Sequence, residues 1–379
     1  MSTSLTTEFE RQFHSPASFL VRAPGRVNII GEHTDYNEGF VLPMAIDRAV
    51  QIVLRPRPDR RVILHSLEYG ETVEFSLDGL HKGNGWAEYI KGAAWAMQED
   101  GWTLSGWNGV MTGDVPRGAG LSSSSAVVVA AIMACAAASG REPGPVKVAL
   151  LGRQAEDGWV GVHGGIMDQM VSVLSRPGHA LFLDCRTLEI QHIPIPEGMA
   201  VAVLDTSTRR GLVGSPYNDR RHQCETAAKA FGVRSLRDVD ETMFRSGAGR
   251  LEDVIRCRAR HVITENARVL QAVEVMRRGD AVALGRLLDA SHASLRNDFE
   301  VSNEALDTMV SIASLQSGCY GARMTGAGFG GCAVAILEQE RGPDFTASVT
   351  EQYRRATGLM PEIYLCQAAQ GASLTCLTL

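Results

Sequence analysis

The feature that most constrains this chain is a glycine loop that leads into an unusually apolar helix. Residues 113–126 read Gly-Asp-Val-Pro-Arg-Gly-Ala-Gly-Leu-Ser-Ser-Ser-Ser-Ala. The first turn of a helix presents unpaired N–H groups and a partial positive charge, and glycines let an anion approach them closely. A serine N-cap explains one serine but not four in a row. The segment therefore predicts a phosphate-binding loop, although Ala119 rather than lysine follows Gly118, so it is not a Walker A loop.

A second glycine loop lies in the other half of the chain. Residues 325–332, Thr-Gly-Ala-Gly-Phe-Gly-Gly-Cys, contain the pattern G-x-G-x-x-G. A dinucleotide site needs a helix directly after these glycines, whereas 332–337 reads as a buried strand. Close packing of two backbones is an alternative reason for so many glycines. Two such loops in opposite halves predict a cleft whose walls meet over one phosphorylated ligand.

A run of polar side chains follows the first predicted strand. Glu32, His33, Thr34 and Asp35 stand between Gly31 and Gly39, which allow a tight loop. Carboxylates and imidazole accept from and donate to vicinal hydroxyl groups, so the run suits a polyhydroxyl ligand. A solvated turn is the alternative interpretation.

An acidic residue marks a third candidate segment. Residues 161–170 read Gly-Val-His-Gly-Gly-Ile-Met-Asp-Gln-Met, which places Asp168 at the start of an apolar helix behind three glycines. A carboxylate there stabilises the helix by its interaction with the dipole. The same position also suits an acid that faces a ligand, and the residues alone leave both interpretations open.

Composition and charge argue against several classes of function. The 379 residues carry 37 Lys and Arg against 43 Asp and Glu, whereas nucleic-acid binders normally carry a basic excess. The longest apolar run, 126–138, is too short to span a bilayer, and residues 1–11 lack the apolar segment of a signal peptide. Eight cysteines without C-x-x-C spacing predict neither a zinc site nor a disulfide framework. We expect a cytoplasmic protein that binds neither nucleic acid nor membrane.

The predicted elements divide into two α+β halves. Pro177, Gly178, Pro194 and Pro196 cluster at the junction, so we expect domains at 1–178 and 179–379. The expected strands are 19–23, 41–54, 62–65, 71–77, 110–111, 180–184, 200–204, 322–325 and 332–337. The expected helices are 86–97, 122–138, 146–156, 166–174, 216–230, 253–277, 281–291 and 304–313.

Together these segments resemble the galactokinase branch of the GHMP small-molecule kinases. Residues 25–36 are similar to the galactokinase signature, 116–124 to the GHMP phosphate loop and 324–332 to the third family motif. The similarity covers most of residues 16–370 and includes the segments 165–169, 215–221 and 291–292. It implies a two-domain α+β GHMP kinase fold, with a ribosomal S5-like N-terminal domain, a ferredoxin-like C-terminal domain and the active site in the cleft between them.

The resemblance also implies a reaction and its participants. It implies transfer of a phosphoryl group from ATP to the anomeric 1-OH of α-D-galactose, with Mg²⁺, as the first committed step of the Leloir pathway. A monomer is expected, with a homodimer left open. Asp168 would remove or orient the proton of the 1-OH, and Arg26 would lie against Asp168 and the γ-phosphate.

The remaining site residues follow from the same resemblance. The implied sugar-binding residues are Glu32, His33, Thr34, Asp35, Gly165 and Tyr217. The implied nucleotide-binding residues are Ser66, Trp86, Gly118, Ala119, Gly120, Leu121, Ser122, Ser123 and Ser124. Ser124 and Glu156 would hold the magnesium ion, which prefers hard oxygen ligands. Trp86 fits a core position as well as an adenine contact.

The chain departs from the family pattern at two places, and two other functions stay open. His163 and Gly164 stand where many galactokinases have a cysteine, which leaves the sugar selectivity undecided, and Ala327 replaces a common glycine of the third motif. One alternative is a 1-kinase for a related sugar such as N-acetylgalactosamine or a uronic acid; the intact 32–35 run and Tyr217 favour galactose. The other is a non-catalytic sugar and ATP sensor, against which the intact serine loop, Arg26 and Asp168 argue.

Overall fold

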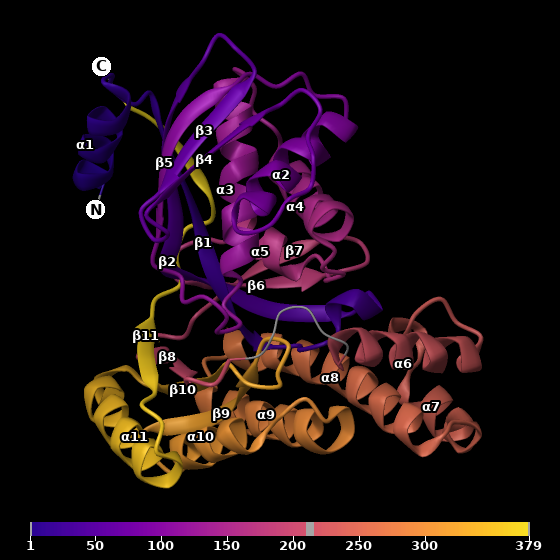
Figure 1. Ribbon diagram of the computed structural model, residues 1–379. Coiled ribbons are helices and arrows are strands. Elements are labelled where there is room, and N and C mark those ends of the chain that lie inside the picture. The colour runs from indigo at the N-terminus through magenta and orange to yellow at the C-terminus, as the bar shows by residue number, and fades with distance from the viewer. Residues whose placement is uncertain (1, 210–215, 378–379) are drawn as a thin grey trace.

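The computed structural model describes residues 2–209 and 216–377 and contains two β-sheets with helices packed on them (Figure 1). Ser215, which opens one of the segments named above, lies outside the described residues. The first sheet has the order β12-β1-β2-β5-β3-β4, and β6 and β7 extend it through β2. The second sheet has the order β11-β8-β10-β9. The α+β fold class is therefore confirmed.

The strands and helices have the following bounds. The first sheet comprises β1 (Phe19–Ile30), β2 (Phe40–Pro56), β3 (Arg61–Ser66), β4 (Glu71–Ser76), β5 (Trp107–Gly113), β6 (His179–Asp184), β7 (Ile190–Pro194) and β12 (Ser373–Cys376). The second comprises β8 (Met199–Asp205), β9 (Cys319–Thr325), β10 (Cys332–Glu338) and β11 (Glu362–Cys366). The helices are α1 (Ser2–Phe13), α2 (Ala87–Glu99), α3 (Ser123–Ala138), α4 (Pro145–Gln154), α5 (Met167–Leu174), α6 (Pro216–Phe231), α7 (Glu241–Gly247), α8 (Asp253–Arg277), α9 (Ala281–Ser294), α10 (Glu304–Ser314) and α11 (Gly342–Thr357).

Every strand and helix predicted from the pattern is present, but several differ in extent; the predicted strand 110–111, for example, is part of the longer β5. The predicted strand 19–23 continues to Ile30, because an irregularity between Pro24 and Arg26 lets the chain pass its proline without leaving the sheet. The predicted helix 146–156 ends as α4 at Gln154, and a π-helical turn, Ala155–Val160, follows it.

The apolar helix α3 forms the centre of the first half. Twelve of its sixteen residues are buried, as its pattern predicted, and α2, α4 and α5 lie around it on one face of the first sheet (Figure 1). Helix α1 packs on the opposite face, where Leu5 and Phe9 contact Val53 of β2 and Val110 of β5. These two valines are paired across the strands, so both point to the same face. No helix within residues 2–209 and 216–377 is both long and apolar enough to cross a membrane.

The two sheets share one apolar core, which fixes how the halves meet. Val27 and Ile29 of β1 belong to the same buried cluster as Val203 of β8 and Val334 of β10. Ala119 and Leu121 of the first glycine loop also belong to this cluster. The phosphate loop predicted from the sequence is therefore anchored in the junction between the sheets.

The two glycine loops meet at this junction. Gly326 and Gly331 both have a positive φ, and a Cβ atom on them would lie 3.1 Å from the carbonyl oxygen of Gly120 and 3.0 Å from that of Ala119. Side chains would hold the loops apart, so glycine is needed where the two backbones approach. The two glycine loops, from opposite halves of the chain, therefore lie against each other.

A second close approach gives a test of the packing. A Cβ atom on Gly285 of α9 would overlap the backbone carbonyl oxygen of Tyr320 in β9. We predict that Gly285→Ala lowers the free energy of unfolding by about 2 kcal/mol or more, as overpacking does. Urea denaturation followed by circular dichroism measures this change.

The matched control is Gly249→Ala, since a Cβ atom there would meet no atom within 4 Å. It should leave the denaturation midpoint nearly unchanged. Equal midpoints for the two variants would contradict the close helix–strand contact.

Candidate active site

A cavity of about 820 Å³ opens where the two glycine loops meet. Of the residues predicted to form the site, the following line it: Arg26, Glu32, His33, Asp35, Trp86, Gly118, Gly120, Leu121, Ser122, Ser123, Ser124, Glu156, Gly165, Asp168 and Tyr217. They come from β1 and the polar loop after it, from the first glycine loop, from the π-helical turn and from α3, α5 and α6. The fold thus gathers these residues, from Arg26 to Tyr217, 191 positions apart in the sequence, around one space.

Three predicted residues lie outside the lining of this cavity. The Thr34 hydroxyl donates to the backbone carbonyls of Gly31 and Phe40, at 2.9 and 2.6 Å, and so holds the polar loop in shape. Ser66 is buried and donates to Glu68 at 3.2 Å, and Ala119 packs in the core between the sheets. Each of the three supports a neighbour that does face the cavity.

The Arg26 guanidinium joins three segments of the site. Its Nε donates to Asp168 Oδ1 at 2.8 Å, and Nη2 lies 2.7 Å from the same oxygen. Its Nη1 donates to the carbonyl of Gly120 at 2.6 Å. Arg26 is 5% exposed, so water screens these bonds little. Arg26 thereby joins β1 to the first glycine loop and to α5.

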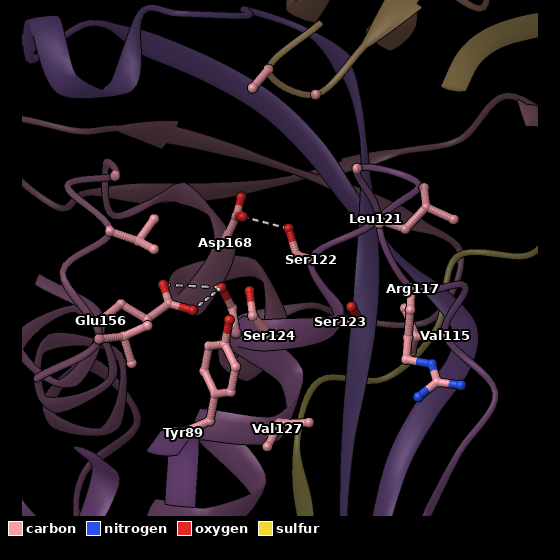
Figure 2. Close-up of a pocket in the computed structure, with 18 of the residues that line it drawn as sticks. Tyr89, Val115, Arg117, Leu121, Ser122, Ser123, Ser124, Val127, Glu156 and Asp168 are labelled. Atoms are coloured by element: carbon pink, nitrogen blue, oxygen red, sulfur yellow. Dashed lines mark hydrogen bonds between the residues drawn. The ribbon is translucent and has the colours of Figure 1, made fainter. Parts of the chain in front are cut away.

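Ser122 forms a hydrogen bond with the second carboxylate oxygen of Asp168. Its hydroxyl donates to Asp168 Oδ2, and Figure 2 shows the two side chains facing each other. Ser122 has a φ of 56°, a left-handed conformation that serine rarely adopts. The acid is therefore held on both oxygens without a ligand, and a hydroxyl that binds Oδ2 would replace Ser122.

Glu32 connects the polar loop to the second glycine loop. Its Oε1 accepts from Arg323 Nη2 at 3.1 Å, from Thr325 Oγ1 at 3.0 Å and from the amide of Gly326 at 2.7 Å. Arg323 is fully buried and also donates to the carbonyls of Asn28 and Ile29. These further hydrogen bonds compensate for the hydration that the Glu32–Arg323 ion pair loses on burial. No sequence pattern marked Arg323, although it stands two residues before Thr325.

Aromatic rings form one wall beside His33. Tyr36 shares a hydrogen bond of 2.9 Å with His33 Nδ1. The rings of Tyr217 and Phe299 lie 5.6 and 4.7 Å from the His33 ring. Tyr36 directly follows the polar run 32–35, and this position in the sequence could have identified it as a site residue. Phe299 ends a π-helical turn, and no sequence pattern marked it.

Asp35 and Gly165 face each other closely. Burial, with the Asp168 charge as the second cause, raises the pKa of the Asp35 carboxyl to about 6. A Cβ atom on Gly165 would overlap the Asp35 carboxylate. Position 165 therefore needs glycine to leave room for this acid.

Glu156 lines the same cavity and lies in the π-helical turn. Ser125 donates to its carboxylate at 3.0 Å, and Gln169, the residue after Asp168, donates to its other oxygen. Burial, followed by the Asp168 charge, raises the pKa of Glu156 to about 7. Ser125 ends the run of four serines and Gln169 ends the segment 165–169, but neither was predicted to be a site residue.

The oxygen atoms beside Glu156 fit part of a magnesium site. Figure 2 shows Ser124 and Glu156 on the same side of the cavity, away from Arg117. The described residues contain no group of three or more His, Cys, Asp or Glu that could hold a metal ion. Mg²⁺ usually binds one or two carboxylates and keeps water and phosphate oxygens as its other ligands. One carboxylate and a hydroxyl suit that type of site.

Trp86 belongs to the core and to the cavity at once. It is 9% exposed and packs in the cluster around α3, and its Nε1 donates to Glu71 at 3.1 Å. The exposed ring of Tyr69 stacks on it, with 5.5 Å between the ring centres and 6° between the planes. The two interpretations of Trp86 are therefore compatible.

Comparisons with known proteins agree with this geometry. Residues 7–56 match the galactokinase galactose-binding signature, 88–176 the N-terminal domain of GHMP kinases and 272–355 their C-terminal domain. A galactokinase of Roseiflexus sp. (strain RS-1) is 43% identical over 373 residues, which cover 97% of this chain and 95% of that protein.

Solved structures show the same relationship. The crystal structure of Lactococcus lactis galactokinase complexed with galactose has a TM-score of 0.95 and 31% identity, and the match covers 98% of this chain and 99% of that one. Mevalonate kinase of Methanococcus jannaschii shares the fold, with a TM-score of 0.69 and 16% identity over 93% of this chain and 99% of its own. The two glycine loops lie around the Arg26–Asp168 pair, the three family models match, and the identity extends over nearly the whole length. The chain therefore belongs to the galactokinase family of the GHMP kinases.

Proposed function

We propose that this chain transfers the γ-phosphoryl group of ATP to the 1-OH of α-D-galactose and releases galactose 1-phosphate and ADP. The observation that carries the proposal is the Arg26–Asp168 ion pair, which lies between the polar loop and the phosphate loop. The 43% identical galactokinase and the solved galactokinase that holds galactose support the choice of sugar.

Asp168 and Arg26 would position the reacting groups. Phosphoryl transfer depends on alignment and on charge stabilisation rather than on covalent catalysis. The sugar 1-OH would donate to Asp168 Oδ2 in place of Ser122, and its oxygen would attack the γ-phosphorus as the bond to the ADP oxygen breaks. The proton would pass to Asp168, and the Arg26 charge would face the transferred group.

The phosphate loop and the acid beside it would hold the nucleotide. Gly118, Gly120 and the serines 122–124 present the first turn of α3 to the phosphates. Ser124 and Glu156 would hold Mg²⁺, which when bound neutralises charge on the β- and γ-phosphates. The Ser122 hydroxyl, once released by Asp168, would be free to donate to a phosphate oxygen.

The sugar would bind at the opposite end of the cavity. Glu32, His33, Asp35 and Tyr217 offer acceptors and donors to its hydroxyl groups, and Gly165 leaves space for Asp35. His163 and Gly164, the residues that depart from the common family pattern, line the same cavity. A cytoplasmic location, a monomeric state and the domain division at residue 178 stay predictions from the sequence.

The role of Asp168 gives the first test. We predict that Asp168→Asn lowers the turnover number by about three orders of magnitude, because the amide cannot accept the proton. The dissociation constant for ATP should stay within about twofold, as this variant removes no phosphate ligand. A coupled ADP-release assay and titration calorimetry measure the two quantities.

Asp59→Asn is the matched control, since Asp59 also pairs with an arginine, Arg57, but lies outside the cavity. It should have wild-type turnover. Wild-type turnover in Asp168→Asn would refute the proposed role of the acid.

The raised pKa of Asp35 predicts a pH dependence of sugar binding. A carboxyl group with a pKa of about 6 is charged at pH 7.5 and protonated at pH 5. Sugar hydroxyls donate more strongly to the charged form, so the dissociation constant for galactose should rise by about tenfold from about pH 7.5 to about pH 5. Calorimetry without nucleotide measures this change.

Asp35→Asn should bind galactose weakly at every pH, with no such step. If the variant kept the wild-type pH profile, another group would be the origin of the step.

A further inference from the structure

The lining of the cavity carries more negative than positive charge. Five of its described residues are acidic: Glu32, Asp35, Glu68, Glu156 and Asp168. Two are arginines, Arg26 and Arg117, and Arg26 is already paired with Asp168. Arg117 forms no ion pair with any carboxylate in the described ranges 2–209 and 216–377. A nucleoside triphosphate that enters this space meets Arg117 as the lining arginine whose charge no acid neutralises.

Arg117 lies within the predicted phosphate loop. It directly precedes Gly118 and is the one basic residue in the segment 113–126. Loops of the Walker A type carry a lysine that reaches the phosphates, and this loop has none. Figure 2 shows Arg117 beyond Ser123, on the side of the cavity away from Glu156.

The guanidinium of Arg117 lies over an aromatic ring. Its Cζ lies 4.7 Å from the centre of the Tyr69 ring, and Tyr69 stacks in turn on Trp86. Tyr69 is 47% exposed, and a cation–π contact at an exposed site is weak. Charge-assisted hydrogen bonds from arginine to phosphate are stronger, and they have a geometry that arginine matches on two oxygens.

We propose that Arg117 binds the triphosphate of the nucleotide and leaves the Tyr69 ring to do so. Arg117 then supplies the positive charge that a lysine supplies in Walker A loops. It faces the phosphates from the side opposite Glu156, so the two ends of the triphosphate are held by a protein cation and by the proposed metal site. This inference rests on the proposed function, because it takes ATP as the ligand.

The test compares nucleotides that differ only in phosphate number. In Arg117→Met, which keeps an apolar stem of similar length, the dissociation constant for ATP should rise about tenfold, as the loss of one charged hydrogen-bonding group predicts. The constant for ADP should rise less, and that for adenosine should stay within about twofold. Arg117→Lys should restore most of the ATP affinity. Titration calorimetry on the full chain with Mg²⁺ measures all of these.

Arg141→Met is the matched control, because the Arg141 guanidinium also lies over an aromatic ring, that of Trp102, at 5.6 Å, but outside the cavity. It should leave every constant unchanged. Equal losses for ATP and adenosine in Arg117→Met would mean that Arg117 shapes the base pocket only, and unchanged ATP affinity would refute any role; either result overturns the inference. Failure of the wild-type chain to bind ATP would instead refute the proposed function.

Discussion

The arrangement of this site depends on the guanidinium of Arg26. Three of its nitrogen atoms contact Asp168 and the Gly120 carbonyl, and these partners belong to segments about 90 and 140 residues away in the sequence. Removal of this side chain would leave the Gly120 carbonyl and the Oδ1 atom of Asp168 without the donor that binds them here. The strand that carries Arg26 also carries the core residues Val27 and Ile29, so the same element packs the two sheets together and aligns the reacting groups.

A second constraint is the concentration of acids in a confined space. Glu32 is compensated by Arg323 and two further donors, and it binds the second glycine loop to the polar loop. Within residues 2–209 and 216–377 neither Asp35 nor Glu156 forms an ion pair with an arginine, and burial raises the pKa of both. Such groups gain from ligands that bring hydrogen-bond donors or cations. A sugar at Asp35 and a metal ion at Glu156 would supply them.

The sequence predicted the architecture and much of the site, for physical reasons that are visible in particular residues. Helix α3 follows from an apolar run that only burial can accommodate, and the clustered glycines indicated where backbones approach each other. What local patterns do not contain are contacts made across the fold. Strand β12 has four residues and exists because it pairs with β1, more than 350 positions away. Arg323, Gln169 and Phe299 reach the site only through tertiary packing, and Thr34 turns from the cavity to bond the backbone.

The central claim is that this cavity directs phosphoryl transfer to one hydroxyl of one sugar. The most direct measurement is ³¹P and ¹H nuclear magnetic resonance of the product formed from galactose, ATP and Mg²⁺. The geometry around Asp168 predicts a single sugar phosphate, α-D-galactose 1-phosphate, formed in step with ADP. A product phosphorylated at another hydroxyl, or hydrolysis of ATP with no sugar phosphate, would contradict the account.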